Sequence, residues 1–228
     1  MKKQLLILTA LVIGLIWQVH AQSSKETRNL RNFNSVKVSN SIKAELVQGD
    51  RNSIEIEVSG IEIGLVETEI VDKTLEIKLA KGNYRNQTVK VKVTYREILG
   101  VEATTSASVV VKSPIESEES YVFATTSAYL EAEFISDILN IEAATNAKMY
   151  LKGSADEVRV KAYTNAEIDG KSLKVQDLEI QANTAATVHL KVANSIDGAL
   201  ATAAKLFYEG NPAKINIKTN TGAKVTKK

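Results

Sequence analysis

Apolar and polar residues alternate along residues 101–225, and the alternation is organised into a motif that occurs seven times. The clearest copy is residues 141–149, Ile-Glu-Ala-Ala-Thr-Asn-Ala-Lys-Met. Each copy has a threonine at its centre, an alanine two residues later and an apolar residue four residues later. The central threonines are Thr105, Thr126, Thr145, Thr164, Thr184, Thr202 and Thr221. They are 18 to 21 residues apart, a fixed period that is typical of a solenoid.

The shared positions of the motif lie at even distances from the threonine. Even spacing puts side chains on one face of an extended strand, so we expect the threonines, alanines and aliphatic residues to face inward together. A helix is not expected, because apolar residues do not recur at i, i+3, i+4 and i+7. About 19 residues at about 3.3 Å each give a coil perimeter of about 60 Å. The pattern predicts an all-β fold, a parallel β-helix with about 19–20 residues per coil.

The centre of each copy is made of small residues, which suits a sharp bend with little room. The residue after the threonine is small in every copy: Ser106, Ser127, Asn146, Asn165, Ala185, Ala203 and Gly222. A β-sandwich of short strands is the alternative, since it also gives alternation and turns. Sandwich strands need not repeat one another, however, and the seven matching copies favour the solenoid.

The amino terminus has the features of a secretory signal peptide over residues 1–21. Lys2 and Lys3 precede an apolar stretch at residues 5–16, and Val-His-Ala at 19–21 forms a cleavage site. The apolar stretch is shorter than the about 20 residues that a transmembrane helix needs. We therefore expect an exported protein, in the periplasm or at the cell surface, with no transmembrane segment after signal cleavage.

The rest of the chain divides into three parts. Residues 22–32 are polar and are predicted to be a flexible leader. Residues 33–100 show strand patterns without the clean repeat, and we expect them to form the opening β coils and cap of the solenoid; a separate small β domain is the alternative. Within them, residues 40–42 (Asn-Ser-Ile) resemble a degenerate first copy of the motif. Residues 101–228 form the regular repeat β-helix, whose open end must be covered because bare strand edges recruit other chains.

Composition removes several classes of function. The formal net charge of +2 falls to zero once the signal peptide takes away Lys2 and Lys3, so the net charge gives no general attraction to nucleic acid or anionic lipid. The sequence contains no cysteine. That excludes thiol catalysis, cysteine-bound zinc, a disulfide framework and a lipoprotein-type anchor.

Candidate chemistry is sparse. His189 is the one histidine after the signal peptide; it lies between Val188 and Leu190, and alternation places it outward. A Ser-His-Asp site would have to use His189, but no Gly-x-Ser-x-Gly motif is present. Paired carboxylates could serve a glycosidase or a calcium-dependent polysaccharide lyase. The two candidate groups are Glu116, Glu118 and Glu119, and Glu131, Glu133 and Asp137.

Both acidic groups are better interpreted as solvated surface, so we predict no catalytic, cofactor-binding or metal-ligating residues. An ice-binding array of threonines is also not expected, because such threonines must face solvent and these are expected to face inward.

Segments near the two ends of the chain that follows the signal peptide carry a family likeness. Residues 33–38 (Phe-Asn-Ser-Val-Lys-Val) and 42–50 (Ile-Lys-Ala-Glu-Leu-Val-Gln-Gly-Asp) resemble the opening of the putative auto-transporter adhesin, head-GIN domain family. Residues 208–212 (Tyr-Glu-Gly-Asn-Pro) and 221–225 (Thr-Gly-Ala-Lys-Val) resemble its closing Tyr-x-Gly-x-Pro and last turn. The likeness covers about residues 28–226. It implies export by a Bacteroidetes-type bacterium, a right-handed parallel β-helix with Gly-Ser-Gly-like turns, and a role in adhesion.

The chain departs from the family in its turns, where threonine and alanine replace glycine in every copy except at Gly222. Glycine accepts a positive φ, whereas threonine resists it strongly. We therefore expect the corners of this solenoid to be bends in the β region.

The sequence favours a non-enzymatic exported binding or adhesion module. Its expected partner is a polysaccharide or an envelope protein, because solenoid faces offer extended recognition surfaces. The alternatives are a carbohydrate-active β-helix enzyme of the lyase or hydrolase type and a periplasmic structural protein.

Overall fold

The computed structural model describes residues 23–228, which form a β-solenoid built from one continuous seventeen-stranded sheet. The predicted signal peptide lies outside the described residues. The first nine strands are β1 (Ser24–Asn29), β2 (Ser35–Val38), β3 (Lys43–Gln48), β4 (Ser53–Ser59), β5 (Val66–Val71), β6 (Thr74–Leu79), β7 (Thr88–Tyr95), β8 (Gly100–Ala103) and β9 (Ser108–Val111). The remaining eight are β10 (Ile115–Ala124), β11 (Tyr129–Ala143), β12 (Lys148–Ala162), β13 (Glu167–Ala182), β14 (Thr187–Leu200), β15 (Lys205–Glu209), β16 (Lys214–Thr219) and β17 (Lys224–Lys227). A 3₁₀ turn, η1 (Ile63–Leu65), is the one helical element in this part of the chain.

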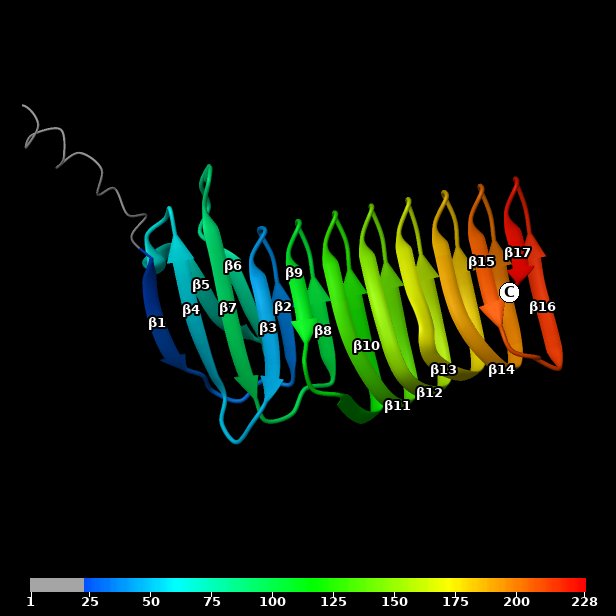
Figure 1. Cartoon of the computed structure of the whole chain (residues 1–228), viewed down its shortest axis with the longest axis horizontal. Coiled ribbons are helices and arrows are strands. Elements are labelled where there is room, and N and C mark those ends of the chain that lie inside the picture. The colour runs from blue at the N-terminus through cyan, green and yellow to red at the C-terminus, as the bar shows by residue number, and fades with distance from the viewer. Residues whose placement is uncertain (1–22) are drawn as a thin grey trace, which may run out of the picture.

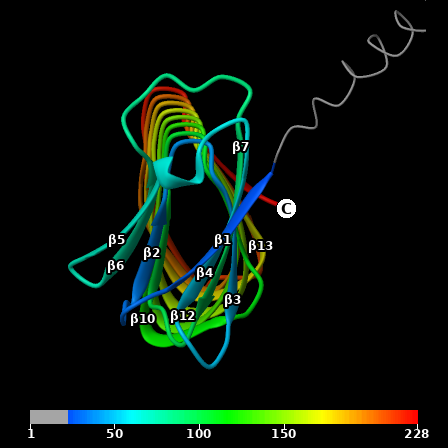
Figure 2. The same ribbon diagram turned by 90° about the vertical axis from the view of Figure 1, so that its left-hand side faces the viewer.

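The coils form two walls joined by one tight edge and one rounded edge (Figures 1 and 2). Wall A contains β1, β4, β7, β3 and β9, the first halves of β11 to β14, and then β15 and β17. Wall B contains β5, β6, β2, β8 and β10, the second halves of β11 to β14, and then β16. From β8 and β9 onward each strand pairs in parallel with the next coil, so the parallel β-helix predicted from the repeat is confirmed. The right-handed coil implied by the family likeness stays a prediction.

The narrow interior is filled by columns of aliphatic side chains. In the coil around residue 145, Ile141, Ala143, Ala147 and Met149 are each no more than 2% exposed. The same positions are buried in the other coils up to Leu206, except for the partly exposed Gly198, and the alanine column is therefore inward as predicted. The core rests on stacked small and branched residues, with few large rings inside it.

The tight edge corrects two expectations, and the coil at Thr145 shows both. The φ angles of Thr145 and Asn146 are 50° and 61°, and the N–H of Ala147 donates to the carbonyl of Ala144 over 3.1 Å. Two positive φ angles inside such a hydrogen bond define a type I′ turn. The same geometry recurs at every threonine of the motif, so the predicted bends in the β region are wrong. The threonines are also exposed, so the expected inward face is wrong for them.

Hydrogen bonds between coils explain why threonine accepts this conformation. The N–H of Asn146 donates to the carbonyl of Thr164 over 2.9 Å, and each turn from Ser41 to Ala203 makes the equivalent bond to the next coil. A left-handed conformation costs an L-residue roughly 1–2 kcal/mol, and the ladder of turns offsets that cost in every coil. The threonine lies in a two-residue turn that interrupts the alternation of the strand. Its even spacing from the buried residues therefore does not place its side chain on their face.

Exposed threonines also remove the reason given above for excluding an ice-binding array. They stand, however, in a single column along the narrow edge. The residues that precede them differ from coil to coil: Thr104, Thr125, Ala144, Tyr163, Asn183, Ala201 and Asn220. The edge is therefore not a broad threonine surface.

The first coil in the sequence is not the first coil in space. Strand β2 lies between β6 and β8, and β3 lies between β7 and β9. Residues 49–99 thus leave the solenoid, build its amino-terminal end and return. Asn40 and Ser41 both have φ of 59°, and the N–H of Ser41 donates to the carbonyl of Thr105 over 2.9 Å. This segment repeats the turn of the later coils, as expected for a first copy of the motif.

The segment expected to be a flexible leader contains a strand, and that expectation is wrong for residues 24–29. Strand β1 pairs antiparallel with β4 along its whole length. The guanidinium of Arg28 reaches the other wall, where Nη1 donates to the carbonyl of Val66 over 2.7 Å and to Thr68 Oγ1 over 2.9 Å. Polar composition is what a terminal strand needs, because it covers the end of the core and meets solvent on its other side. Figure 2 shows β1 crossing in front of the coils at this end.

Candidate functional site

Aromatic side chains gather on the outside of this solenoid, where a ligand can reach them. Of the chain's four phenylalanines and seven tyrosines, only Phe33, Tyr95, Phe134 and Tyr208 belong to the buried core. The other seven are partly or fully exposed: Tyr84, Tyr121, Phe123, Tyr129, Tyr150, Tyr163 and Phe207. Exposed rings that cluster on a surface mark binding sites more often than single exposed apolar residues do.

The outer face of wall B holds a hollow of about 410 Å³ over β8 and β10 to β13. Its aromatic end is made by Tyr121 and Phe123, which point outward because their neighbours Val122 and Ala124 point into the core. Its polar lining comes from the next three coils: Asn140, Glu142, Arg159, Lys161, Glu179 and Gln181. The hollow therefore runs across the strands, from rings to hydrogen-bonding groups.

The ring of Tyr121 lies flat along the wall because its neighbour in the preceding coil is Gly100. A Cβ atom at Gly100 would come within 2.1 Å of Cε1 of that ring. The hydroxyl of Tyr121 reaches Glu102 Oε1 at 3.5 Å, and burial raises the pKa of Tyr121 above its ordinary value. Because Gly100 has no side chain, the ring of Tyr121 can lie against the wall and present a flat face to a ligand.

A second hollow of about 550 Å³ continues the first toward the carboxyl terminus. The two hollows share Glu179 and Gln181, and the small residues Gly198 and Ala199 help to line the second. Its polar rim is made by Tyr163, Asn183, Asp197, Asn216 and Lys218. We call the two hollows together the wall B groove; it spans the coils from β8 to β16.

The charges of the wall B groove are partly neutralised by neighbours. Nε of Arg159 lies 2.6 Å from Glu157, and Lys37 lies 3.8 Å from Glu102. The pKa of Asp197 is lowered, chiefly because the amide of Asn216 donates to it over 2.9 Å. Glu142, Lys161 and Glu179 have no ion-pair partner within 4.0 Å in residues 23–228 and can bond a ligand.

The carboxylates singled out from the sequence lie in two different places on the surface. On wall A, Glu131 accepts a hydrogen bond from the hydroxyl of Tyr129 over 3.1 Å, and Glu133 pairs with Lys152 at 3.4 Å. Asp137 lies apart from both, because β11 bends around the rounded edge between them. There Asp137 shares a hollow of about 400 Å³ with two members of the other acidic group, whereas the third, Glu119, accepts a hydrogen bond from the amide of Asn140 over 2.9 Å. The acidic residues of that hollow are Glu116, Glu118, Asp137 and Asp156.

His189 faces outward on wall A, as alternation predicted, and stacks on Phe207 in the next coil. The ring centroids are 4.6 Å apart with 14° between the planes. Burial, with Lys171 nearby, lowers the pKa of His189, so the imidazole is neutral at neutral pH. Across residues 23–228, no three His, Cys, Asp or Glu side chains are placed to share a metal ion.

Sequence reasoning missed Tyr121 and Phe123 although the signal was present. The alternation around Val122 assigns both rings to the outside, and an outward pair of aromatic residues indicates a binding surface. The role of Gly100 had no such signal, because its contact with Tyr121 depends on which residues pair across coils.

Fold and surface together define a β-solenoid with ligand-sized grooves on its outer walls. Among the described residues, no helix has the length and apolar character needed to span a membrane. The chain belongs to the family described as "Putative auto-transporter adhesin, head GIN domain", whose model matches residues 32–212. A search of curated proteins finds no match to the chain.

Solved structures from Bacteroidetes share the fold at low sequence identity. A putative adhesin from Bacteroides fragilis is similar with a TM-score of 0.81 and 14% identity, covering 92% of this chain and 98% of that one. A putative adhesin from Parabacteroides merdae gives a TM-score of 0.71 and 16% identity, covering 92% and 97%. A protein from Parabacteroides distasonis described as a putative lipid binding protein gives a TM-score of 0.68 and 16% identity, covering 92% of this chain and 98% of that one. These similarities establish the fold.

Proposed function

We propose that this protein is an exported, non-enzymatic binding module that recognises an extended polymer, a polysaccharide of the cell surface or envelope, along the wall B groove. The observation that carries the proposal is the groove itself. Two aromatic rings lie at one end of it, and amide, carboxylate and ammonium groups follow over the next coils. The adhesin-type family supports a binding role, and the similar adhesins support export.

The shape of the groove favours a chain-like ligand over a compact one. Neighbouring coils lie about 4.8 Å apart, so the groove offers similar contacts at regular steps across the strands. A polymer with a repeating unit can use several of these steps, whereas a small ligand can use one. Charges of both signs line the groove, which does not favour a polyanion such as nucleic acid.

The chemistry of the groove favours a sugar polymer. Pyranose rings present C–H faces that pack on aromatic rings, and their hydroxyl groups both donate and accept hydrogen bonds. The flat ring of Tyr121 with Phe123 offers the first kind of contact. Asn140 and Gln181 offer the second, because each amide carries a donor and an acceptor. Tyrosine rings add contact area at low conformational cost.

The test is binding of residues 22–228 to immobilised barley β-glucan, wheat arabinoxylan and yeast mannan. The double variant Tyr121→Ala, Phe123→Ala should weaken binding at least about tenfold. Gly100→Ala should weaken it as well, by lifting the ring of Tyr121 off the wall. Val71→Ala, an exposed apolar residue on the β5–β6 hairpin, is the control and should bind normally. Binding that is unchanged in the double variant would rule out the wall B groove.

Turnover and location are measured alongside. Release of reducing ends or unsaturated sugars from any of the three polysaccharides would favour the carbohydrate-active enzyme. Protease shaving of intact cells, with lysed cells as the control, separates the two sites of export. Digestion on intact cells supports adhesion at the surface, and protection until lysis supports a role in the periplasm.

A further inference from the structure

Wall A carries its own aromatic residues, on the side of the solenoid opposite the wall B groove. The rings of Tyr129 and Tyr150 lie in neighbouring coils with centroids 5.5 Å apart and 38° between their planes. Tyr150 is 41% exposed, one of the most exposed large hydrophobic residues in residues 23–228. The hydroxyl of Tyr129 donates to Glu131, which fixes the first ring beside the second. The pair is held in place and open to solvent.

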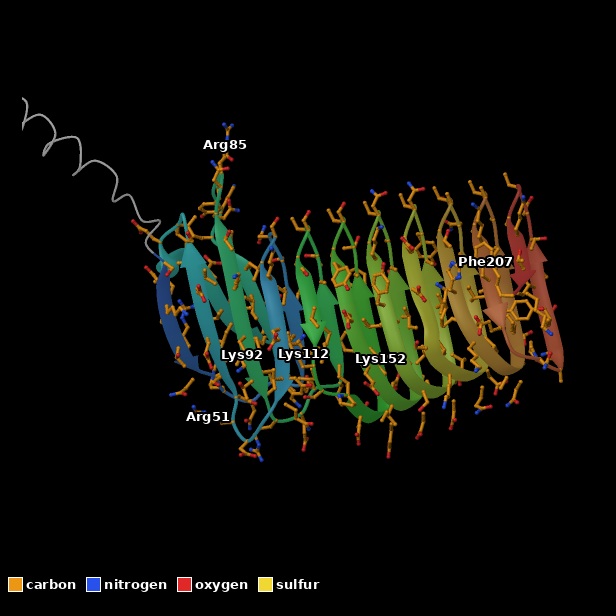
Figure 3. The ribbon with its side chains drawn as sticks, viewed as in Figure 1. Arg51, Arg85, Lys92, Lys112, Lys152 and Phe207 are labelled. Carbon is orange, nitrogen blue, oxygen red and sulfur yellow. The ribbon has the colours of Figure 1, made fainter. Side chains whose placement is uncertain are left out.

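A second aromatic pair continues the row toward the carboxyl terminus. His189 and Phe207 stack face to face, and Nζ of Lys228 lies 4.9 Å from the centroid of Phe207. A hollow of about 290 Å³ lies against this pair and is also lined by Lys171. Figure 3 shows Phe207 on the face of wall A that is turned to the viewer. Tyr150, His189 and Phe207 occupy the same outward column, because the strand register aligns them through Asp169.

The charges around this row neutralise one another. Its ion pairs are Lys148–Glu167 at 3.3 Å, Lys152–Glu133 at 3.4 Å and Lys171–Asp169 at 2.8 Å. The lowered pKa of His189 keeps that ring uncharged at neutral pH. The contacts left for a ligand are ring faces flanked by hydrogen-bonding groups, which fits a neutral sugar chain better than a polyanion.

We propose that wall A is a second binding track for a neutral polysaccharide, made by Tyr129, Tyr150, His189 and Phe207, and that one molecule therefore bridges two polymer chains. This inference rests on the proposed function of the wall B groove. The two tracks face opposite directions with the filled core between them, so one extended polymer chain cannot lie on both. Two sites on one rigid body link chains without any new contact between protein molecules.

The experiment measures bridging directly and uses the same three polysaccharides. Biotinylated polysaccharide on a sensor captures the protein, and fluorescent polysaccharide of the same kind is then supplied in solution. The wild-type protein should hold the fluorescent chain on the sensor. A sensor without protein is the blank, and light scattering must show that the protein is monomeric, since a dimer could bridge chains through one face alone.

Two variants separate the walls. Tyr150→Ala, Phe207→Ala removes rings from wall A, and Tyr121→Ala, Phe123→Ala removes rings from wall B. Each should bind the sensor more weakly, through the remaining wall alone. At equal amounts of captured protein, each should hold at least tenfold less fluorescent chain than the wild type. Circular dichroism shows whether each variant is folded, and the single variant Tyr150→Ala serves if the double variant is not.

The outcomes distinguish the two proposals. No binding of the wild-type protein to any of the three polysaccharides would overturn the proposed function together with this inference. Binding to the sensor without retention of fluorescent chain would overturn bridging alone and leave the wall B groove intact. Unchanged retention in the wall A variant would show that its rings are not the second track.

Discussion

The regular coils of residues 101–228 and the amino-terminal region before them are both built from β-strands, but their strands pair in different ways. In the regular coils each strand pairs with the strand of the next coil, as Tyr129 pairs with Lys148. In the amino-terminal region, Ser35 pairs with Gly100, β4 runs antiparallel to β7, and Arg28 ties the two walls together. Figure 1 shows the even spacing of the coils on one side and the mixed strands on the other.

The difference shows what a repeat can and cannot provide. Each regular coil offers its neighbour the same apolar columns and the same turn, so coils stack by nearest-neighbour contacts. The same rule leaves the end of the stack with bare strand edges and an open core. The amino-terminal region breaks the repeat to close that end. We expect a disturbance in the regular coils to act through packing, and one in the amino-terminal region to act through a few specific bonds.

The largest effect is expected from overfilling a regular coil. Ala147 is fully buried, so Ala147→Leu should lower the free energy of unfolding by about 1–3 kcal/mol. Urea denaturation followed by circular dichroism measures it. Lys148→Leu adds a similar side chain at the next, exposed position and should change stability by no more than about 0.5 kcal/mol. If Ala147→Leu changed the free energy of unfolding as little as Lys148→Leu does, the interior at the alanine column would have space for a larger side chain, and the prediction would be wrong.

The next effect is expected from the tie across the amino-terminal end. Arg28→Ala removes the charged hydrogen bonds to Val66 and Thr68 and should cost about 1–2 kcal/mol. Hydrogen exchange should quicken in β1 and β5 and stay unchanged in β12 and β13. The control is Lys25→Ala, which breaks an exposed pair with Glu57 worth at most about 1 kcal/mol. Faster exchange throughout the solenoid would show that the two regions unfold as one unit.

A smaller effect of opposite sign is expected at the tight edge. Thr145 has a φ of 50°, which asparagine tolerates better than a β-branched residue does. Thr145→Asn should therefore raise the free energy of unfolding by up to about 1 kcal/mol. Thr145→Val keeps the branched side chain and should give no gain. A loss of stability in Thr145→Asn would show that the threonine hydroxyl stabilises the edge.

The smallest effect is confined to high pH and to the amino-terminal region. Burial raises the pKa of Tyr95 from 10.0 to about 12, and the nearby side chain of Ser113 offsets only part of that rise. Because the folded state holds this proton more tightly, the stability due to it is complete below pH 10 and is lost as the pH rises toward 12. Tyr95→Phe should flatten that part of the pH profile without lowering stability at pH 7. A profile identical to that of the wild type would place the loss elsewhere.

Much of the fold could be predicted because the spacing and alternation of the repeated motif depend directly on it. The copies around Ala147 and Met149 specify strands, a coil length and an inner face, and alternation also places Tyr121, Phe123 and His189 outside. The left-handed conformation of Thr145 could not be predicted from its own preferences, since it depends on hydrogen bonds between turns of different coils. Sequence distance likewise hid the contact of Tyr121 with Gly100.

The sequence by itself determined that this chain winds into a β-solenoid, because identical positions recur once per coil and must stack. It also determined which residues fill the core, because alternation is a local property of a strand. Only the tertiary structure decided the order of the first coils, the antiparallel cover of β1 and the grooves on the two walls. These features depend on which strands pair. Strands pair through backbone hydrogen bonds, and the backbone groups are alike in nearly every residue, so the side-chain pattern does not show which strands become neighbours.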